Sequence, residues 1–350
     1  MNNNIKGGKL LEKGGYGCIY HPHIDCDGNE TKNLDYVSKI SLYNSDILKE
    51  IEMGKIIKTI IPNYNNFFVP IEKSCTISIN KISNDLIGDC SIIKNNKETN
   101  NFIINNVPYV NGKTLNDFFS TIDKQPNFSK TFYKIFLHLY IAIKTLQEYN
   151  ILHYDIKPAN IMVNNKNIPL ILDFGISFFV NEKDITKNYD KFYIYAPDYY
   201  YWSLQSNIIS WILTDNKKLE QIITDKDITN IINDYFINNQ IFGKSSTLLS
   251  AEFINKYQVR TYNYYIKNFT NIKGSECIKR LIKSWREWDI YSLAQIFLHF
   301  HHQYQHNFEN EKYNDTFIKI LISCIDHYPT NKLTEKQIIY TMQSIIPDDI

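Results

Sequence analysis

Short apolar stretches separated by turn residues mark the N-terminal third of the chain. Residues 8 to 43 read as strands, because glycines separate two apolar stretches and "LDYVSKISLY" alternates apolar and polar positions. The next segment, "SDILKEIEMGKIIKTII", repeats apolar residues at helical spacing, with Ser45 and Asp46 as candidate caps and Pro62 after its end. Residues 67 to 110 return to β-like segments such as "CTISI". The pattern predicts a β-rich part that contains one helix.

The remaining two thirds of the chain have a helical pattern. The segment "SKTFYKIFLHLYIAIKTLQEYN" carries an apolar stripe and predicts a long helix packed on a core. The stripe consists of Phe132, Ile135, Phe136, Leu139, Ile143 and Leu146. We therefore predict a β-rich domain over 1–110 and a helical domain over 111–350.

Charge and cysteine content narrow the functional classes. The net charge of +1 gives no overall attraction to nucleic acid or to an anionic membrane. The sequence lacks a signal-peptide core and any apolar run of the roughly 18 residues that a membrane span needs. Its six cysteines form no CxxC pair, so we expect reduced thiols in a soluble, cytoplasmic protein. The cysteines are Cys18, Cys26, Cys75, Cys90, Cys277 and Cys324.

The segment "HYDIKPANIMV" carries the densest chemistry. Asp155 lies in a loop that Pro158 keeps from becoming helix, between the long helix and a strand-like run. Its carboxylate could orient a hydroxyl, while Asn160 and the later Asp173 are oxygen ligands of the kind that hold Mg²⁺. Lys157 could neutralise charge on a transferring phosphoryl group. The alternative is a polar loop whose side chains only cap turns.

Together, "HYDIKPAN" and the later "LILDFG" resemble the catalytic loop and the metal-binding motif of eukaryotic-type protein kinases. Lys157, two residues after Asp155, resembles the serine/threonine-specific branch. The resemblance implies an α+β fold of two lobes, a small β-rich N-lobe and a large helical C-lobe. It also implies transfer of the γ-phosphoryl group of ATP, with Mg²⁺, to Ser or Thr hydroxyls of protein substrates.

The same resemblance assigns residues to the nucleotide. The segment "LLEKGGYGCIY" is similar to the glycine-rich loop over the phosphates, although Glu12 replaces the first glycine. Lys39 in "DYVSKI" resembles the strand lysine that anchors the phosphates and pairs with a helix glutamate, here Glu50 or Glu52. The family pattern favours Glu50 and leaves Glu52 open. The loop residues implied to contact ATP are Leu11, Gly14, Gly15, Gly17 and Ile19.

The segment "NNVPYVNGKTLNDFF" resembles the hinge of the family. With Val107 as gatekeeper, the carbonyl of Pro108 and the N–H of Val110 would face the adenine edge, and proline suits a position that only accepts. The alternative is an ordinary turn from strand to helix.

Three later segments resemble closing motifs of the large lobe. "YAPDYY" places Asp198, and "YPTNKLTEKQI" places Lys332, where the family has a buried ion pair. "WDIYSLAQIFLHF" resembles the buried helix whose first aspartate, Asp289, braces the catalytic loop. Residues 201–285 form a long helical insertion, either for docking of a partner or substrate or as thickening of the lobe.

One departure concerns regulation. Tyr154 stands where most members have the arginine that binds a phosphorylated activation loop, so we expect no regulation by such a phosphate. The divergent motifs resemble protein kinases of large DNA viruses (mimivirus-like), which would place the protein in the host cytoplasm or the virion. A divergent kinase from an AT-rich unicellular genome would fit the same features. Two alternatives stay open: an inactive pseudokinase that acts as a scaffold, and a small-molecule phosphotransferase.

Overall fold

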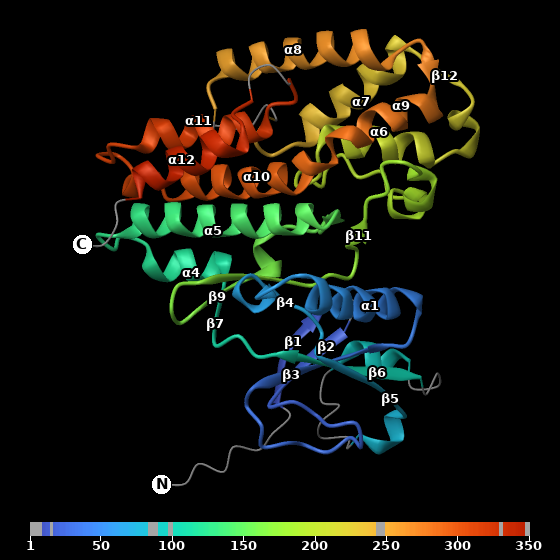
Figure 1. Cartoon of the computed structure of the whole chain (residues 1–350), viewed down its shortest axis with the longest axis vertical. Coiled ribbons are helices and arrows are strands. Elements are labelled where there is room, and N and C mark those ends of the chain that lie inside the picture. The colour runs from blue at the N-terminus through green and yellow to red at the C-terminus, as the bar shows by residue number, and fades with distance from the viewer. Residues whose placement is uncertain are drawn as a thin grey trace. The chain divides into compact units, whose positions relative to one another are not determined.

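The computed structural model describes residues 9–14, 17–82, 90–96, 101–242, 249–328 and 332–346. The chain divides into two compact units (Figure 1). The first comprises residues 1–112 together with 170–177, and the second comprises 113–169 and 178–350. The return of residues 170–177 to the first unit is a feature that the sequence pattern did not predict.

An antiparallel five-stranded sheet forms the centre of the first unit. The strand order is β1 (Lys9–Gly14), β2 (Gly17–His21), β3 (Tyr36–Leu42), β6 (Phe102–Pro108) and β5 (Lys73–Ile77). A short parallel pair, β4 (Phe68–Val69) with β10 (Pro169–Leu172), ties the returning segment to this unit.

The helix α1 (Ser45–Ile60) covers one face of the sheet. Its apolar residues Ile47 and Ile51 pack with Ile71 and with Ile103 of β6. The structure corrects the predicted cap, because the side chain of Asn44 accepts the N–H groups of residues 46 and 47. The helix itself matches the predicted segment.

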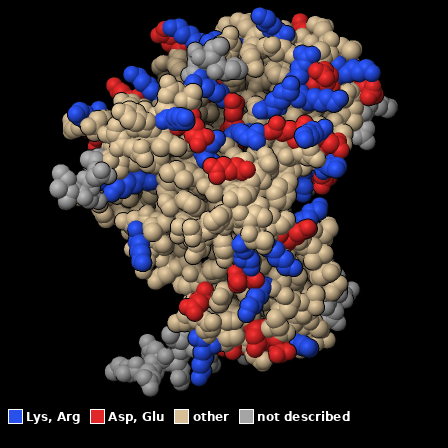
Figure 2. All heavy atoms as spheres, in the orientation of Figure 1, with Lys and Arg blue, Asp and Glu red and all other residues tan. Residues whose placement is uncertain are grey.

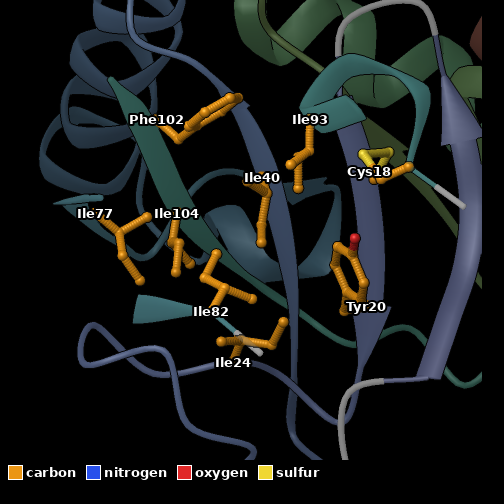
Figure 3. Close-up of a cluster of buried hydrophobic side chains, with 10 residues drawn as sticks. Cys18, Tyr20, Ile24, Ile40, Ile77, Ile82, Ile93, Phe102 and Ile104 are labelled. Carbon is orange, nitrogen blue, oxygen red and sulfur yellow. A yellow bond between two sulfur atoms is a disulfide. The ribbon is translucent and has the colours of Figure 1, made fainter. Parts of the chain in front are cut away.

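A second apolar cluster lies on the opposite face (Figure 3). Successive side chains of a strand point to opposite faces, so Phe102 and Ile104 enter this cluster while Ile103 enters the other. Ile82 and Ile93, the latter in α3 (Ser91–Asn95), complete the cover. Both faces of the sheet are therefore buried.

Two disulfides reinforce this unit and contradict the expectation of reduced thiols. Cys18 of β2 is bonded to Cys90, and Cys26 is bonded to Cys75 of β5. The sequence could not show this, because 72 and 49 residues separate the partners and only the folded sheet brings them together. Disulfides persist in oxidising surroundings, so these two bonds also argue against folding in a reducing compartment. The other two cysteines are free and buried in the second unit.

Helices make up most of the second unit (Figure 1). The predicted long helix is confirmed as α5, and it packs against α10 and α12. The helices are α4 (Leu115–Ile122), α5 (Phe128–Glu148), α6 (Leu204–Leu213), α7 (Asp225–Asn238), α8 (Ala251–Phe269), α9 (Gly274–Leu281), α10 (Trp288–Gln303), α11 (Asn314–Ile325) and α12 (Glu335–Ile345). The strands are β7 (Gly112–Thr114), β8 (Ile151–Leu152), β9 (Ile161–Asn164), β11 (Phe178–Phe179), β12 (Ile222–Ile223) and β13 (Ile272–Lys273).

Residues 201–285 are helical, as their periodicity predicts, and they share a core with the rest of the second unit. Tyr235 of α7 forms a hydrogen bond with Tyr291 of α10, and the Tyr257 hydroxyl donates to the carbonyl of Ile325 (2.8 Å). The rings of Tyr235 and Tyr257 are fully buried, so residues 201–285 are an integral layer of this unit.

The described part of the chain contains no helix whose length and apolar character would carry it across a lipid bilayer. Figure 2 shows lysine and arginine interspersed with aspartate and glutamate over the described residues of the visible face. Proteins that bind the phosphate backbone of a nucleic acid usually present a continuous stripe of positive charge. The described lysine and arginine residues on the visible face do not form such a stripe.

Candidate active site

A buried carboxylate holds the backbone of the loop that follows β8. Asp289, at the start of α10, is 1% exposed and accepts the N–H groups of His153 (2.8 Å) and Tyr154 (2.9 Å). This confirms the predicted bracing. Burial raises the pKa of Asp289, while the two N–H donors favour its charged form. The loop is thus tied to a core helix immediately before Asp155.

The loop brings three of the predicted residues together. The Oδ2 atom of Asp155 accepts the Lys157 ammonium (2.8 Å) and the Asn160 amide (2.8 Å). The Asn160 amide also donates to the Asp155 carbonyl (3.0 Å), and Asn160 is only 7% exposed. Because Asn160 uses its N–H groups on Asp155, its side-chain oxygen is the atom available to a cation.

Tyr199 contacts the same carboxylate, and the sequence did not predict it. Its hydroxyl donates to Oδ1 of Asp155 (2.8 Å). Burial, followed by the negative charge of Asp155, raises the pKa of Tyr199, so the phenol stays neutral. Tyr199 and Asp155 are 44 positions apart in the sequence, and the motif "YAPDYY" indicates only the end of the activation segment. No local spacing could have identified the contact.

Tyr154 occupies the position of the missing arginine and is buried among rings. Its φ of 66° is left-handed, which is uncommon for a bulky residue and is found preferentially at functional sites. The ring stacks on Trp202 (4.9 Å between centroids, 14° between planes). The indole N–H of Trp202 donates to the Tyr154 carbonyl (2.9 Å), so apolar packing fills the place where a charged contact would form.

The expected buried pair of Asp198 and Lys332 is wrong. The Lys332 ammonium lies 2.5 Å from the carboxylate of Glu287, and Asp198 is exposed. The Lys332 side chain is 19% exposed, and a largely buried ammonium needs a carboxylate close by. Glu287, immediately before α10, supplies it.

The first unit holds a second charged cluster. The Lys39 ammonium lies 3.1 and 3.0 Å from the two oxygens of Glu50, and 3.8 Å from Asp173. Glu52 is exposed, so Glu50 is the partner in this structure. Burial acts to lower the pKa of Lys39, but Glu50 and Asp173 outweigh it and the net direction is upward. Burial raises the pKa of Glu50 against the effect of Lys39. Both partners lie largely out of water.

Asp173 sits after β10 with a left-handed φ of 62°. One of its oxygens accepts the N–H of Gly175 (3.2 Å), and its side chain is 42% exposed. The next residue, Phe174, is buried against Phe68 (6.0 Å). This anchor holds the backbone while the carboxylate keeps an open side that could bind a cation.

The glycine-rich strands lie beside Lys39. A Cβ at Gly17 would come within 2.7 Å of the Ser41 hydroxyl oxygen and 2.8 Å of the Ile40 carbonyl, so only glycine fits. Ile19 is directly opposite Lys39 on the neighbouring strand, which puts both side chains on one face. Leu11 is 52% exposed. Gly14 pairs with Gly17, and Gly15 lies outside the described residues.

The segment that resembles a hinge follows the sheet directly. β6 ends at Pro108, which lies opposite Tyr36 of β3. The N–H of Tyr109 donates to the Asp35 carbonyl (2.7 Å), and Val110 is buried. The backbone at Pro108 and Val110 is therefore held by the sheet, and the adenine contacts predicted there stay predictions.

Comparison with known proteins supports the class that the geometry indicates. The family model of the protein kinase domain matches residues 78–200, which include the catalytic loop and Asp173. The chain has the α+β fold of a protein kinase, with a β-rich unit and a helical unit. It is 27% identical over 183 residues to a probable serine/threonine-protein kinase of fowlpox virus, and the aligned region covers 51% of this chain. The chain spans 56% of the length of that relative. Over residues 78–200 the chain is therefore similar to the protein kinase domain, and the relative that it matches is a viral one.

Proposed function

We propose that the protein is a serine/threonine protein kinase that transfers the γ-phosphoryl group of Mg-ATP to protein hydroxyls. The observation that carries the proposal is the arrangement around Asp155. A carboxylate that accepts both the Lys157 ammonium and the Asn160 amide, in a loop braced by Asp289, suits a group that must orient an acceptor hydroxyl.

The residues present fit Mg²⁺ and ATP. Asp173 offers a partly exposed carboxylate and Asn160 an amide oxygen, and Mg²⁺ prefers such oxygen ligands. We assign both as its ligands, where bound Mg²⁺ would neutralise phosphate charge. Lys39, held by Glu50, would bind phosphate oxygens.

The remaining nucleotide contacts follow from the strands of the first unit. Backbone of Gly14 and Gly17, which pair with each other, would approach the phosphates, as the resemblance to the glycine-rich loop implies. Apolar side chains beside Lys39 and the backbone after β6 would hold the adenine. The assigned residues are Leu11, Gly14, Gly15, Gly17, Ile19, Pro108 and Val110.

The class of acceptor rests on Lys157 and on the name of the fowlpox virus relative. Of the two roles predicted for residues 201–285, thickening of the unit has support, because buried tyrosines join this segment to α10. The viral resemblance implies the host cytoplasm or the virion, and the Cys18–Cys90 and Cys26–Cys75 disulfides favour the virion, where disulfides persist.

Transfer of labelled γ-phosphate to the protein itself and to generic protein substrates tests the proposal. We expect label on phosphoserine or phosphothreonine from wild type and from the exposed control variant Asp198→Asn. Asp155→Asn and Asp173→Ala should lose at least 99% of it, because each removes a charge used in the transfer. A wild type that neither binds Mg-ATP nor transfers label would refute the proposal in favour of a scaffold. Transfer only to small molecules would favour the small-molecule phosphotransferase.

A further inference from the structure

Tyr199 and Trp202 contact two consecutive residues of the catalytic loop. The Tyr199 hydroxyl donates to Oδ1 of Asp155 (2.8 Å), and the Trp202 indole N–H donates to the carbonyl of Tyr154 (2.9 Å). The Trp202 ring also stacks on Tyr154. One short turn thus holds the loop backbone and the side chain that the proposed reaction depends on.

The hydrogen bonds of Asp155 leave little freedom. A carboxylate offers about four lone-pair sites, two on each oxygen. Oδ2 accepts from Lys157 and Asn160, and Oδ1 accepts from Tyr199. Counting the hydrogen bonds from the described residues, one site remains, on Oδ1 beside the Tyr199 hydroxyl. An acceptor hydroxyl must reach the base within about 3 Å, so it would have to use that site.

We propose that Tyr199 is a positioning residue, whose hydroxyl fixes the rotation of the Asp155 carboxylate and directs the acceptor hydroxyl to the free lone pair of Oδ1. The inference rests on the proposed kinase activity and adds to it the group that sets the orientation of the base. The Tyr199 ring is itself held edge-on by Tyr201 (5.4 Å) and Trp202 (5.1 Å).

The phenol suits this role chemically. It remains a neutral donor because burial and the Asp155 charge oppose its ionisation. It is attached to a different segment from Lys157 and Asn160, which both belong to the loop of Asp155. Three donors from two directions define the plane of a carboxylate, whereas the two loop donors both act on Oδ2.

The kinetic test compares Tyr199→Phe with Tyr200→Phe. Tyr200 is a matched control, because its hydroxyl donates to Tyr201 and not to the catalytic loop. We expect Tyr199→Phe to lower kcat about tenfold, the effect of losing one hydrogen bond to a charged group, with the KM for ATP within about twofold of wild type. Tyr200→Phe should keep wild-type kcat. A kcat at or above wild type in Tyr199→Phe, or an equal loss of ATP affinity, would overturn the proposal.

A stability cycle tests the contact even if no activity is found. Tyr199→Phe is made in wild type and in Asp155→Ala, and thermal midpoints are compared. We expect Tyr199→Phe to lower the midpoint by about 3 °C more in wild type than in Asp155→Ala, where the bond is already gone. Equal shifts in both backgrounds would overturn the positioning role. If the wild type transfers no phosphate, but Tyr199→Phe lowers the thermal midpoint more in wild type than in Asp155→Ala, only the proposed kinase activity is refuted.

Discussion

Removing the disulfide between Cys18 and Cys90 should strongly destabilise the first unit. Both residues are fully buried in the cluster that covers one face of the sheet (Figure 3). We would replace both by alanine, which avoids placing a hydroxyl in an apolar core. The bond ties β2 to the segment that leads into α3.

The size of the effect follows from the loop that the bond closes. The partners are 72 residues apart, and the chain-entropy relation for a loop of that length gives about 4 kcal/mol at 25 °C. Whole domains are stable by only about 5 to 15 kcal/mol, so this is a large share of the stability of the unit. The Cys26–Cys75 bond closes 49 residues and should contribute a similar amount, since the dependence on length is logarithmic.

The assay is urea denaturation monitored by amide hydrogen exchange in peptides from β3 and β6. Because both strands belong to the first unit, the free energy of unfolding measured in this way is that of the first unit alone. We expect the Cys18→Ala and Cys90→Ala double variant to lose about 4 kcal/mol, and Cys277→Ala, a free buried cysteine of the second unit, to leave these peptides unchanged. Alkylation of the unfolded, unreduced protein should modify two thiols. Six modified thiols, or a double variant within about 1 kcal/mol of wild type, would refute the reasoning.

Three further perturbations have defined outcomes. Glu50→Gln leaves Lys39 without its closest charge, so the KM for ATP should rise about tenfold while the exposed control Glu52→Gln stays at wild type; equal effects in steady-state kinetics would contradict the assigned ion pair. Asp289→Ala orphans two buried N–H groups and should cost roughly 2 to 6 kcal/mol in urea denaturation, and a loss below 1 kcal/mol would show that the loop does not depend on this brace. Burial, then Lys332, lowers the pKa of His327 to about 3, below its unfolded value, so its contribution is complete above about pH 6.5 and is lost as pH falls toward 3. Wild type should therefore lose about 2 kcal/mol more than His327→Phe between pH 7 and pH 5, and parallel pH profiles would contradict this.

Local sequence patterns predicted much of the fold and part of the candidate active site. The apolar stripe of α5 and the segment of α1 were predictable, because a helix is formed by residues three and four positions apart. Asp155, Lys157 and Asn160 were predictable for a similar reason, since six consecutive residues of one loop contain all three and the hydrogen bonds among them close within it. The β-rich and helical parts also follow from the period of the apolar residues.

Contacts between distant segments could not be obtained in that way. Asn44 rather than Ser45 caps α1, and Glu287 rather than Asp198 pairs with Lys332, because each choice depends on which group the folded backbone places within reach. The pairing of four cysteines allows several connectivities, and the sheet selects one of them.

Local motifs are enough to predict the type of chemistry: a carboxylate, an ammonium and an amide within one loop, and a strand lysine with a helix glutamate nearby. The groups that hold these side chains in place come from segments far away in the sequence. Tyr199 reaches Asp155 across 44 residues and Asp289 reaches the loop across more than 130. The physical reason is that a motif records which groups are present, whereas their orientation is set by hydrogen bonds from segments that only folding brings together.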